Sequence, residues 1–132
     1  MLGRFLLFGL FGCAVEYAFT VLARRPKLPS LWMAPLYGIA APLFPPLRAT
    51  LASRPPLERA ATYGLAMIAA EYTIGRALRG TILAVPWTYS GSFAIDGLTR
   101  LDYLPLWALY GLALERVDDA IRPQSARSPE AG

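Results

Sequence analysis

The chain has 132 residues, of which 55% are hydrophobic and 17% charged, and its formal net charge is +4. This length suffices for one domain. Because the chain has no histidine, zinc sites with histidine ligands, Ser-His-Asp triads and Cys-His pairs are excluded. A single cysteine, Cys13, excludes a disulfide within the chain. The basic residues flank apolar stretches and form no patch, so we expect no nucleic-acid partner. We also expect no metal and no other cofactor.

Four apolar stretches follow one another, at about residues 4–23, 31–47, 59–79 and 99–116. A helix of about twenty residues crosses the roughly 30 Å hydrocarbon core of a bilayer. A soluble domain of this size has too little interior to bury four such stretches. We therefore predict an all-α fold, an integral membrane bundle of four transmembrane helices over residues 1–117. We expect this bundle in the lipid bilayer of a bacterial inner membrane. Residues 118–132 should follow it as a polar tail without regular structure.

The first and third stretches resemble each other. Residues 9–24 and 64–79 align without gaps and share six pairs: Gly9/Gly64, Leu10/Leu65, Ala14/Ala69, Glu16/Glu71, Tyr17/Tyr72 and Arg24/Arg79. The same offset aligns Trp32 with Trp87. A charge in the middle of a hydrocarbon span costs about 2.5–3.5 kcal/mol or more, so two at matching positions are unlikely to be accidental. The repeat predicts two related helical hairpins that share a polar intramembrane seam, formed by Glu16, Glu71, Tyr17, Tyr72 and Arg76.

Two interpretations of the glutamate pair are open. Gly9 and Gly12 share a helical stripe with Glu16, as Gly64 and Gly75 do with Glu71, and such small residues allow close helix approach. The stripes should therefore face each other or the second stretch. The carboxylates either form a proton, cation or headgroup site, or each has a structural arginine or backbone partner. Both carboxylates lining one water-reachable cavity would favour the site, and separate, closed, hydrogen-bonded niches would favour the structural interpretation.

Prolines interrupt the second stretch at positions 35, 42, 45 and 46. Proline removes one helical hydrogen bond and clashes with the preceding turn. We predict kinks at Pro35 and Pro42 and a helix end at Pro45–Pro46.

The segment between Gly80 and Arg100 is the longest irregular one. Its notable residues form an interfacial motif, which comprises Trp87, Tyr89, Ser90, Asp96, Gly97 and Arg100. One interpretation is a small-molecule site in which Asp96, Arg100 and Asp102 form a polar cluster. The other is an aromatic belt at the headgroup level, with a turn at Asp96–Gly97.

These motifs resemble the transmembrane protein 229 family and a related bacterial family of ABC-transporter type IV membrane proteins. The resemblance rests on GCAVEYAFT, KLPSLWMAPLYG, EYTIGRALR, PWTYS and DGLTRLDYLPLW, and it covers residues 8–117. In the family the fourth block, here PWTYS, usually reads Trp-Asp-Tyr-Ser, and Thr88 stands at the position of its acid. The resemblance implies a four-helix integral membrane protein and no particular activity, and the chain has no phosphate-binding motif of the G-x-x-x-x-G-K type.

The sequence leaves three functional hypotheses. The first is a non-catalytic membrane component or partner-binding subunit, as a homo-oligomer or with other membrane subunits. The second is a permease-like transporter subunit that uses the Glu16/Glu71 seam. The third is a lipid-modifying enzyme that uses Glu16, Glu71, Asp96 and Arg100.

Overall fold

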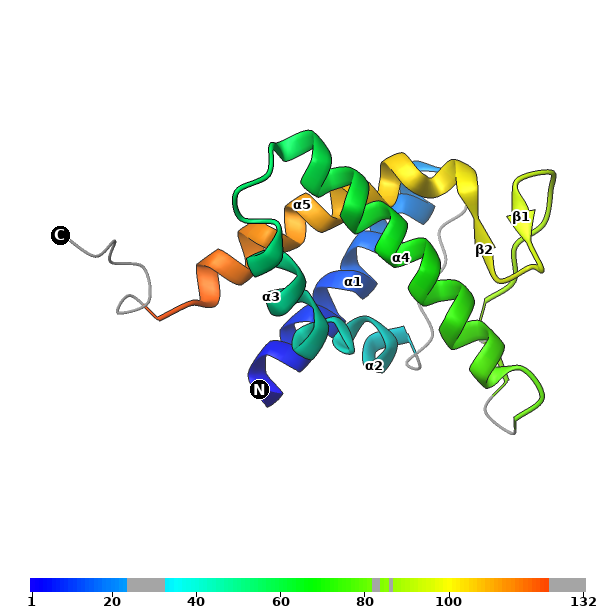
Figure 1. Ribbon diagram of the computed structural model, residues 1–132. Coiled ribbons are helices and arrows are strands. Elements are labelled where there is room, and N and C mark those ends of the chain that lie inside the picture. Colours follow the sequence, from blue (N-terminus) through cyan, green and yellow to red (C-terminus); the bar gives the residue numbers. More distant parts are fainter. Residues whose placement is uncertain (24–32, 82–83, 86, 124–132) are drawn as a thin grey trace, which may run out of the picture.

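The chain folds into helices joined by one irregular segment, as seen in a computed structural model that describes residues 1–23, 33–81, 84–85 and 87–123. The helices are α1 (Leu2–Leu22), α2 (Met33–Gly38), α3 (Ala40–Thr50), α4 (Pro56–Leu78) and α5 (Leu104–Ile121) (Figure 1). Two antiparallel strands, β1 (Ala94–Ile95) and β2 (Thr99–Arg100), and a 3₁₀ turn, η1 (Leu101–Tyr103), precede α5. The all-α fold class is therefore confirmed. The first loop and the tail beyond residue 123 lie outside the described residues.

The helices pack as two pairs, in which α1 lies against α2 and α3, and α4 lies against α5. Glycines at equivalent positions make both contacts close. A Cβ atom at Gly9 would lie 2.5 Å from the carbonyl oxygen of Ala34, and one at Gly64 would lie 2.7 Å from Leu104. The pairing thus follows the two predicted hairpins, and their origin by duplication stays a prediction.

The second apolar stretch forms two helices that meet at Ile39. Pro42 has no N–H to donate to the carbonyl of Gly38, which explains the break between α2 and α3. The predicted helix end at Pro45–Pro46 is wrong, because both prolines lie inside α3, which continues to Thr50. Phe44 packs in the core, and Arg48 bonds to α5, so tertiary contacts hold the last turns of α3 in place.

The fourth helix begins and ends later than predicted. The prediction began the span at residue 99, yet residues 99–103 form β2 and η1. The prediction also ended the domain at residue 117, yet α5 continues to Ile121, and Asp118 is 0% exposed. Asp118 lies within 3.0 Å of three guanidinium groups, those of Arg4, Arg48 and Arg122. The tail prediction for residues 118–121 is therefore wrong, because these ion pairs hold the last helical turn on the bundle.

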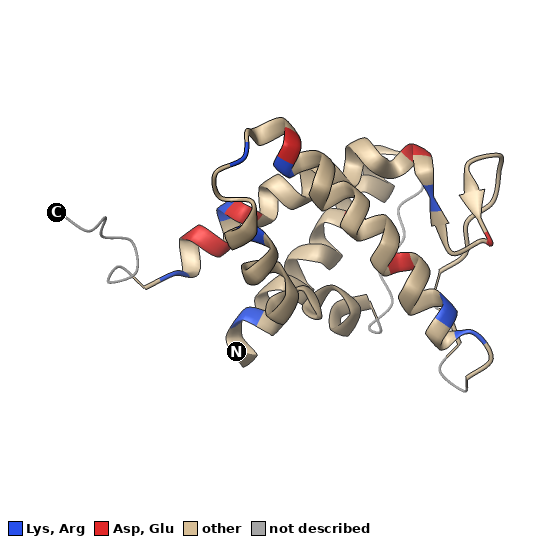
Figure 2. Ribbon diagram, viewed as in Figure 1, with Lys and Arg blue, Asp and Glu red and all other residues tan. Residues whose placement is uncertain are grey.

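A second set of polar contacts joins α4 to the same end of α5. Arg59 lies 2.9 Å from a carboxylate oxygen of Glu115, and the hydroxyl group of Tyr63 donates to that oxygen at 2.6 Å. Together with Asp118, these contacts connect α1, α3, α4 and α5 at one end of the bundle. We call this group the arginine–acid cluster, formed by Arg4, Arg48, Arg59, Arg122, Glu115, Asp118 and Asp119. Figure 2 shows that charged residues gather toward helix ends and that most of the helix length is free of them.

The helix α1 is long and apolar enough to cross a membrane, and among the described residues it alone meets that criterion. Its outward face carries Leu2, Leu6 and Leu10, each more than half exposed. Exposed leucines also lie on the other long helices, at Leu43, Leu65 and Leu109. The four-span membrane bundle therefore stays a prediction.

Candidate functional site

Both repeated glutamates line one cavity of about 190 Å³. Glu16 reaches it from α1 and Glu71 from α4, so the two helix pairs each contribute one carboxylate. The rest of the wall is mostly aromatic and comes from α1, α2, the irregular segment, η1 and α5. We call this space the carboxylate cavity.

Glu16 accepts a hydrogen bond from Tyr37. The tyrosine hydroxyl lies 3.0 Å from Oε2 of Glu16. Close packing of α1 on α2 sets this distance, because a Cβ atom at Gly12 would lie 2.2 Å from the Tyr37 ring. The predicted glycine stripe therefore faces the proline-containing second stretch, and glycine is required at this crossing.

Glu71 accepts two hydrogen bonds from the segment that follows α4. The hydroxyl groups of Tyr89 and Thr99 each donate to it at 2.8 Å, one to each oxygen. Burial and the nearby Glu71 raise the pKa of the Tyr89 phenol, so Tyr89 remains a neutral donor at physiological pH. The irregular segment thus folds back onto α4 to hold a carboxylate.

Neither glutamate has a basic side chain within 4.0 Å in the described part of the chain. The structural interpretation expected an arginine or a backbone partner, and the observed partners are neutral hydroxyl groups. Arginines instead pair with the acids of the helix ends and of η1, which are Glu58, Asp102, Glu115, Asp118 and Asp119. Within the described ranges, no cation therefore compensates the two acids of the carboxylate cavity.

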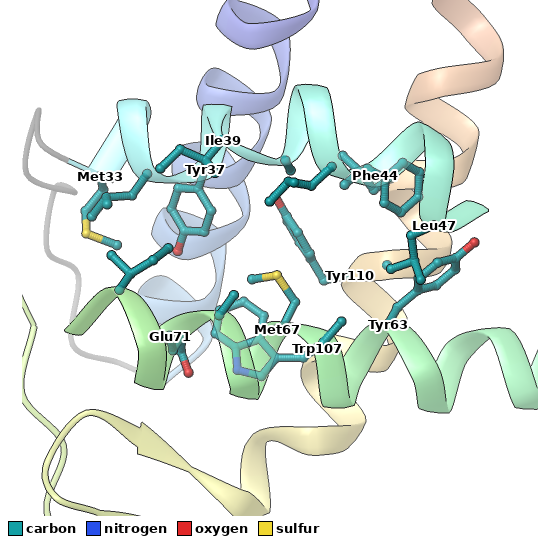
Figure 3. Close-up of a pocket in the computed structure, with 18 of the residues that line it drawn as sticks. Met33, Tyr37, Ile39, Phe44, Leu47, Tyr63, Met67, Glu71, Trp107 and Tyr110 are labelled. Carbon is teal, nitrogen blue, oxygen red and sulfur yellow. The ribbon is translucent and has the colours of Figure 1, made fainter. Parts of the chain in front are cut away.

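A second cavity, of about 170 Å³, adjoins the first and is mostly apolar. It lies between α2–α3 and α4, with Trp107 and Tyr110 of α5 in its wall (Figure 3). Figure 3 also shows Tyr37 and Glu71 at the same end of this space, with Phe44 and Leu47 farther along it. Six residues line both cavities, namely Met33, Tyr37, Glu71, Trp87, Trp107 and Tyr110. We call the second space the apolar cavity.

The other predicted seam residues lie away from the carboxylate cavity. Tyr17 is 42% exposed, and Arg76 is exposed in the last turn of α4. The hydroxyl group of Tyr72 donates to Asp96 at 3.1 Å. Of the five seam residues, only the two glutamates line the carboxylate cavity, and the intramembrane seam stays a prediction.

The predicted interfacial motif divides between two roles. Trp87 and Tyr89 line the carboxylate cavity, and the Trp87 indole N–H donates to the carbonyl oxygen of Leu98 at 2.7 Å. The turn at Asp96–Gly97 is confirmed, since both residues have positive φ, of 52° and 70°, between β1 and β2. Gly97 accepts a backbone bond from Tyr89 at 3.0 Å, which closes the segment.

The predicted polar cluster of Asp96, Arg100 and Asp102 forms only in part. Arg100 pairs with Asp102 at 2.6 Å and donates to the Ser90 carbonyl oxygen at 3.1 Å. The Asp96 carboxylate accepts from Tyr72, and its carbonyl oxygen accepts from Arg79. Arg100 also lies 5.0 Å from the centre of the Tyr103 ring. The four residues proposed for an enzyme therefore do not meet in one place.

Sequence reasoning missed Tyr37, Thr99, Trp107 and Tyr110. A signal for the two tyrosines is present, because Leu-Tyr-Gly occurs at 36–38 and again at 109–111. Both tyrosines line the cavities, and their ring centres lie 6.1 Å apart. Both glycines lie against the partner helix, Gly38 on Phe5 and Gly111 on Tyr63. The second helices of the two pairs thus share a motif as well.

No protein-family model, curated protein or solved structure matches this chain. The resemblance to the transmembrane protein 229 family stays a prediction. Among the described residues, no group of three or more cysteine, aspartate or glutamate side chains could hold a metal ion.

Proposed function

We propose that this chain is a multi-pass membrane protein that binds a solute between its two helix pairs, as a permease-like transporter subunit. One observation carries the proposal: Glu16 and Glu71 line one cavity, and neither has a cationic partner among the described residues. An acidic group inside a membrane domain is costly, and those that persist commonly mark a substrate or ion pathway.

The distribution of polar groups supports membrane insertion. The arginine–acid cluster lies at one end of the bundle, and the pair formed by Arg100 and Asp102 lies near the start of α5. Exposed leucines cover the helices between these ends. α4 and α5 carry charges that lower their mean hydropathy, yet Glu71, Glu115 and Asp118 point into contacts within the bundle.

A cysteine-labelling experiment in cells tests the proposal. In a Cys13→Ser background, Leu106→Cys adds a thiol to the wall of the carboxylate cavity, and Leu10→Cys adds one to the outward face of α1. We expect a charged, membrane-impermeant thiol reagent to label Leu106→Cys both in intact cells and in inverted vesicles. The lipid-facing Leu10→Cys should remain unlabelled in both.

The labelling of the two variants distinguishes the possible outcomes. Rapid labelling of Leu10→Cys, which is 65% exposed in the isolated chain, would exclude its burial in lipid. Labelling of Leu106→Cys from neither side, or from one side alone, would contradict a permease. It would favour the second candidate, a partner-binding membrane subunit, for which the broad apolar face of α1 provides a surface.

A further inference from the structure

We infer that the solute is an amphiphilic organic ammonium cation, with its headgroup in the carboxylate cavity and its hydrocarbon part in the apolar cavity. This inference rests on the proposed function, and it names the chemical class of the ligand.

The negative charge of the carboxylate cavity favours a cationic ligand. Two carboxylates line a space of about 190 Å³, and no basic side chain of the described residues lies within ion-pair distance of either. Arg100, which stacks on Tyr103 of the aromatic wall, is already paired with Asp102. Three hydroxyl donors, on Tyr37, Tyr89 and Thr99, offset part of the cost of burying negative charge. A bound cation would compensate the remainder.

The aromatic wall of the carboxylate cavity favours an organic cation over a metal ion. Six tyrosine and tryptophan side chains line the carboxylate cavity: Tyr37, Trp87, Tyr89, Tyr103, Trp107 and Tyr110. Ring faces attract ammonium groups, and aromatic cages are the usual sites for quaternary ammonium ligands. Hard metal ions prefer several carboxylate or carbonyl oxygen ligands at short distance, and among the described residues no group of three or more acidic or cysteine side chains could hold one. The stacking of Arg100 on Tyr103 at 5.0 Å gives one example of this attraction at the rim.

One unpartnered polar atom indicates a further ligand group. The hydroxyl of Tyr110 is buried, at 4% residue exposure, and has no hydrogen-bond partner within the described chain. The Tyr110 side chain lines both cavities. Buried polar groups without a partner are rare in native proteins and call for a ligand or water oxygen. An ester or hydroxyl oxygen between headgroup and hydrocarbon would accept this hydrogen bond.

The apolar cavity accounts for the amphiphilic part. It continues from Glu71 and Trp107 along α4 toward Phe44 and Leu47 (Figure 3). Its space of about 170 Å³ is bounded mainly by aliphatic and aromatic side chains. A charged solute without a hydrocarbon part would leave this space unused, and a neutral lipid would leave the two glutamates without a counter-charge.

Calorimetric titration of the purified full chain in maltoside micelles tests the inference, with octanoylcholine as the probe. The control ligand is 3,3-dimethylbutyl octanoate, which has the same shape and no charge. We expect saturable binding of the cation and at least tenfold weaker binding of the neutral ester. Glu16→Gln and Glu71→Gln should each weaken cation binding at least tenfold. Glu58→Gln, at an exposed position paired with Arg54, should leave it unchanged.

Equal binding of the two ligands, or wild-type affinity in folded Glu→Gln variants, would overturn the inference. If those variants do not fold, Tyr103→Leu keeps both carboxylates and should still weaken binding severalfold through the lost ring. Phosphatidylcholine in nanodiscs distinguishes the source of the ammonium group. Displacement of the probe identifies a lipid headgroup, no displacement identifies a free amphiphile, and both support the ligand class.

The two proposals fail separately. Saturable cation binding without two-sided labelling of Leu106→Cys would contradict the permease and keep the ligand class. Two-sided labelling without cation binding would keep the permease and contradict the ligand class.

Discussion

Arg48 of α3 donates to Asp118 of α5 at 2.9 Å, across 70 positions of sequence. Arg4 and Arg122 reach the same carboxylate, which is 0% exposed. A single acid near the end of the described chain therefore holds α1, α3 and α5 together.

Asp118→Asn should destabilise the fold by about 3–5 kcal/mol, because it leaves partly buried arginines without their counter-charge. The matched control is Asp119→Asn, at a side chain that is 50% exposed, for which we expect about 1 kcal/mol or less. Thermal unfolding in detergent, followed by circular dichroism, measures both. Equal melting temperatures for the two variants would contradict a central role for Asp118.

Gly12→Ala should destabilise the protein by about 1–3 kcal/mol through overpacking. The added methyl group would lie 2.2 Å from the Tyr37 ring, so Tyr37 must move and lose its bond to Glu16. Gly3→Ala on the same helix meets nothing within 4 Å and should be neutral, or stabilising by up to about 1 kcal/mol. Denaturant unfolding in micelles compares the pair, and a neutral Gly12→Ala would argue against the close crossing of α1 and α2.

Tyr89→Phe should reduce the free energy of unfolding by about 1–3 kcal/mol, because one carboxylate oxygen of Glu71 loses its donor. Tyr72→Phe removes a hydroxyl whose acceptor, Asp96, is exposed, so we expect a smaller loss. A double-mutant cycle with Glu71→Gln measures the coupling directly. Strictly additive effects of Tyr89→Phe and Glu71→Gln would exclude the contact.

The hydrogen bonds from Arg100 lower the pKa of the Asp102 carboxyl below its ordinary value of 3.8. A carboxyl whose pKa is lower in the folded state stabilises the fold above its unfolded value. That contribution is lost as the pH falls through the folded pKa. We expect Arg100→Gln to raise the titration midpoint of Asp102 toward 3.8 in an NMR titration, and an unchanged midpoint would exclude the pair.

Local sequence patterns were sufficient to predict several features of the fold and of the site. Apolar runs predicted the helices, and the repeated glycines predicted close helix approach at Gly9, Gly12 and Gly64. Asp96–Gly97 predicted its turn, because few residue pairs accept positive φ. The shared register of Glu16 and Glu71 identified the two acids of the cavity. Each of these signals depends on backbone preference or on the spacing along one helix.

Only the tertiary structure decided the partners of those acids and the end of the last helix. Four of the seven residues 115–121 are charged, which is typical of a solvated segment, yet arginines from three other helices pair with Glu115 and Asp118. Tyr37, Tyr89 and Thr99 reach the glutamates from separate elements. The sequence by itself determined where helices form and which charges lie within them. Which charges meet depends on how helix ends are brought together, and long-range packing sets that arrangement.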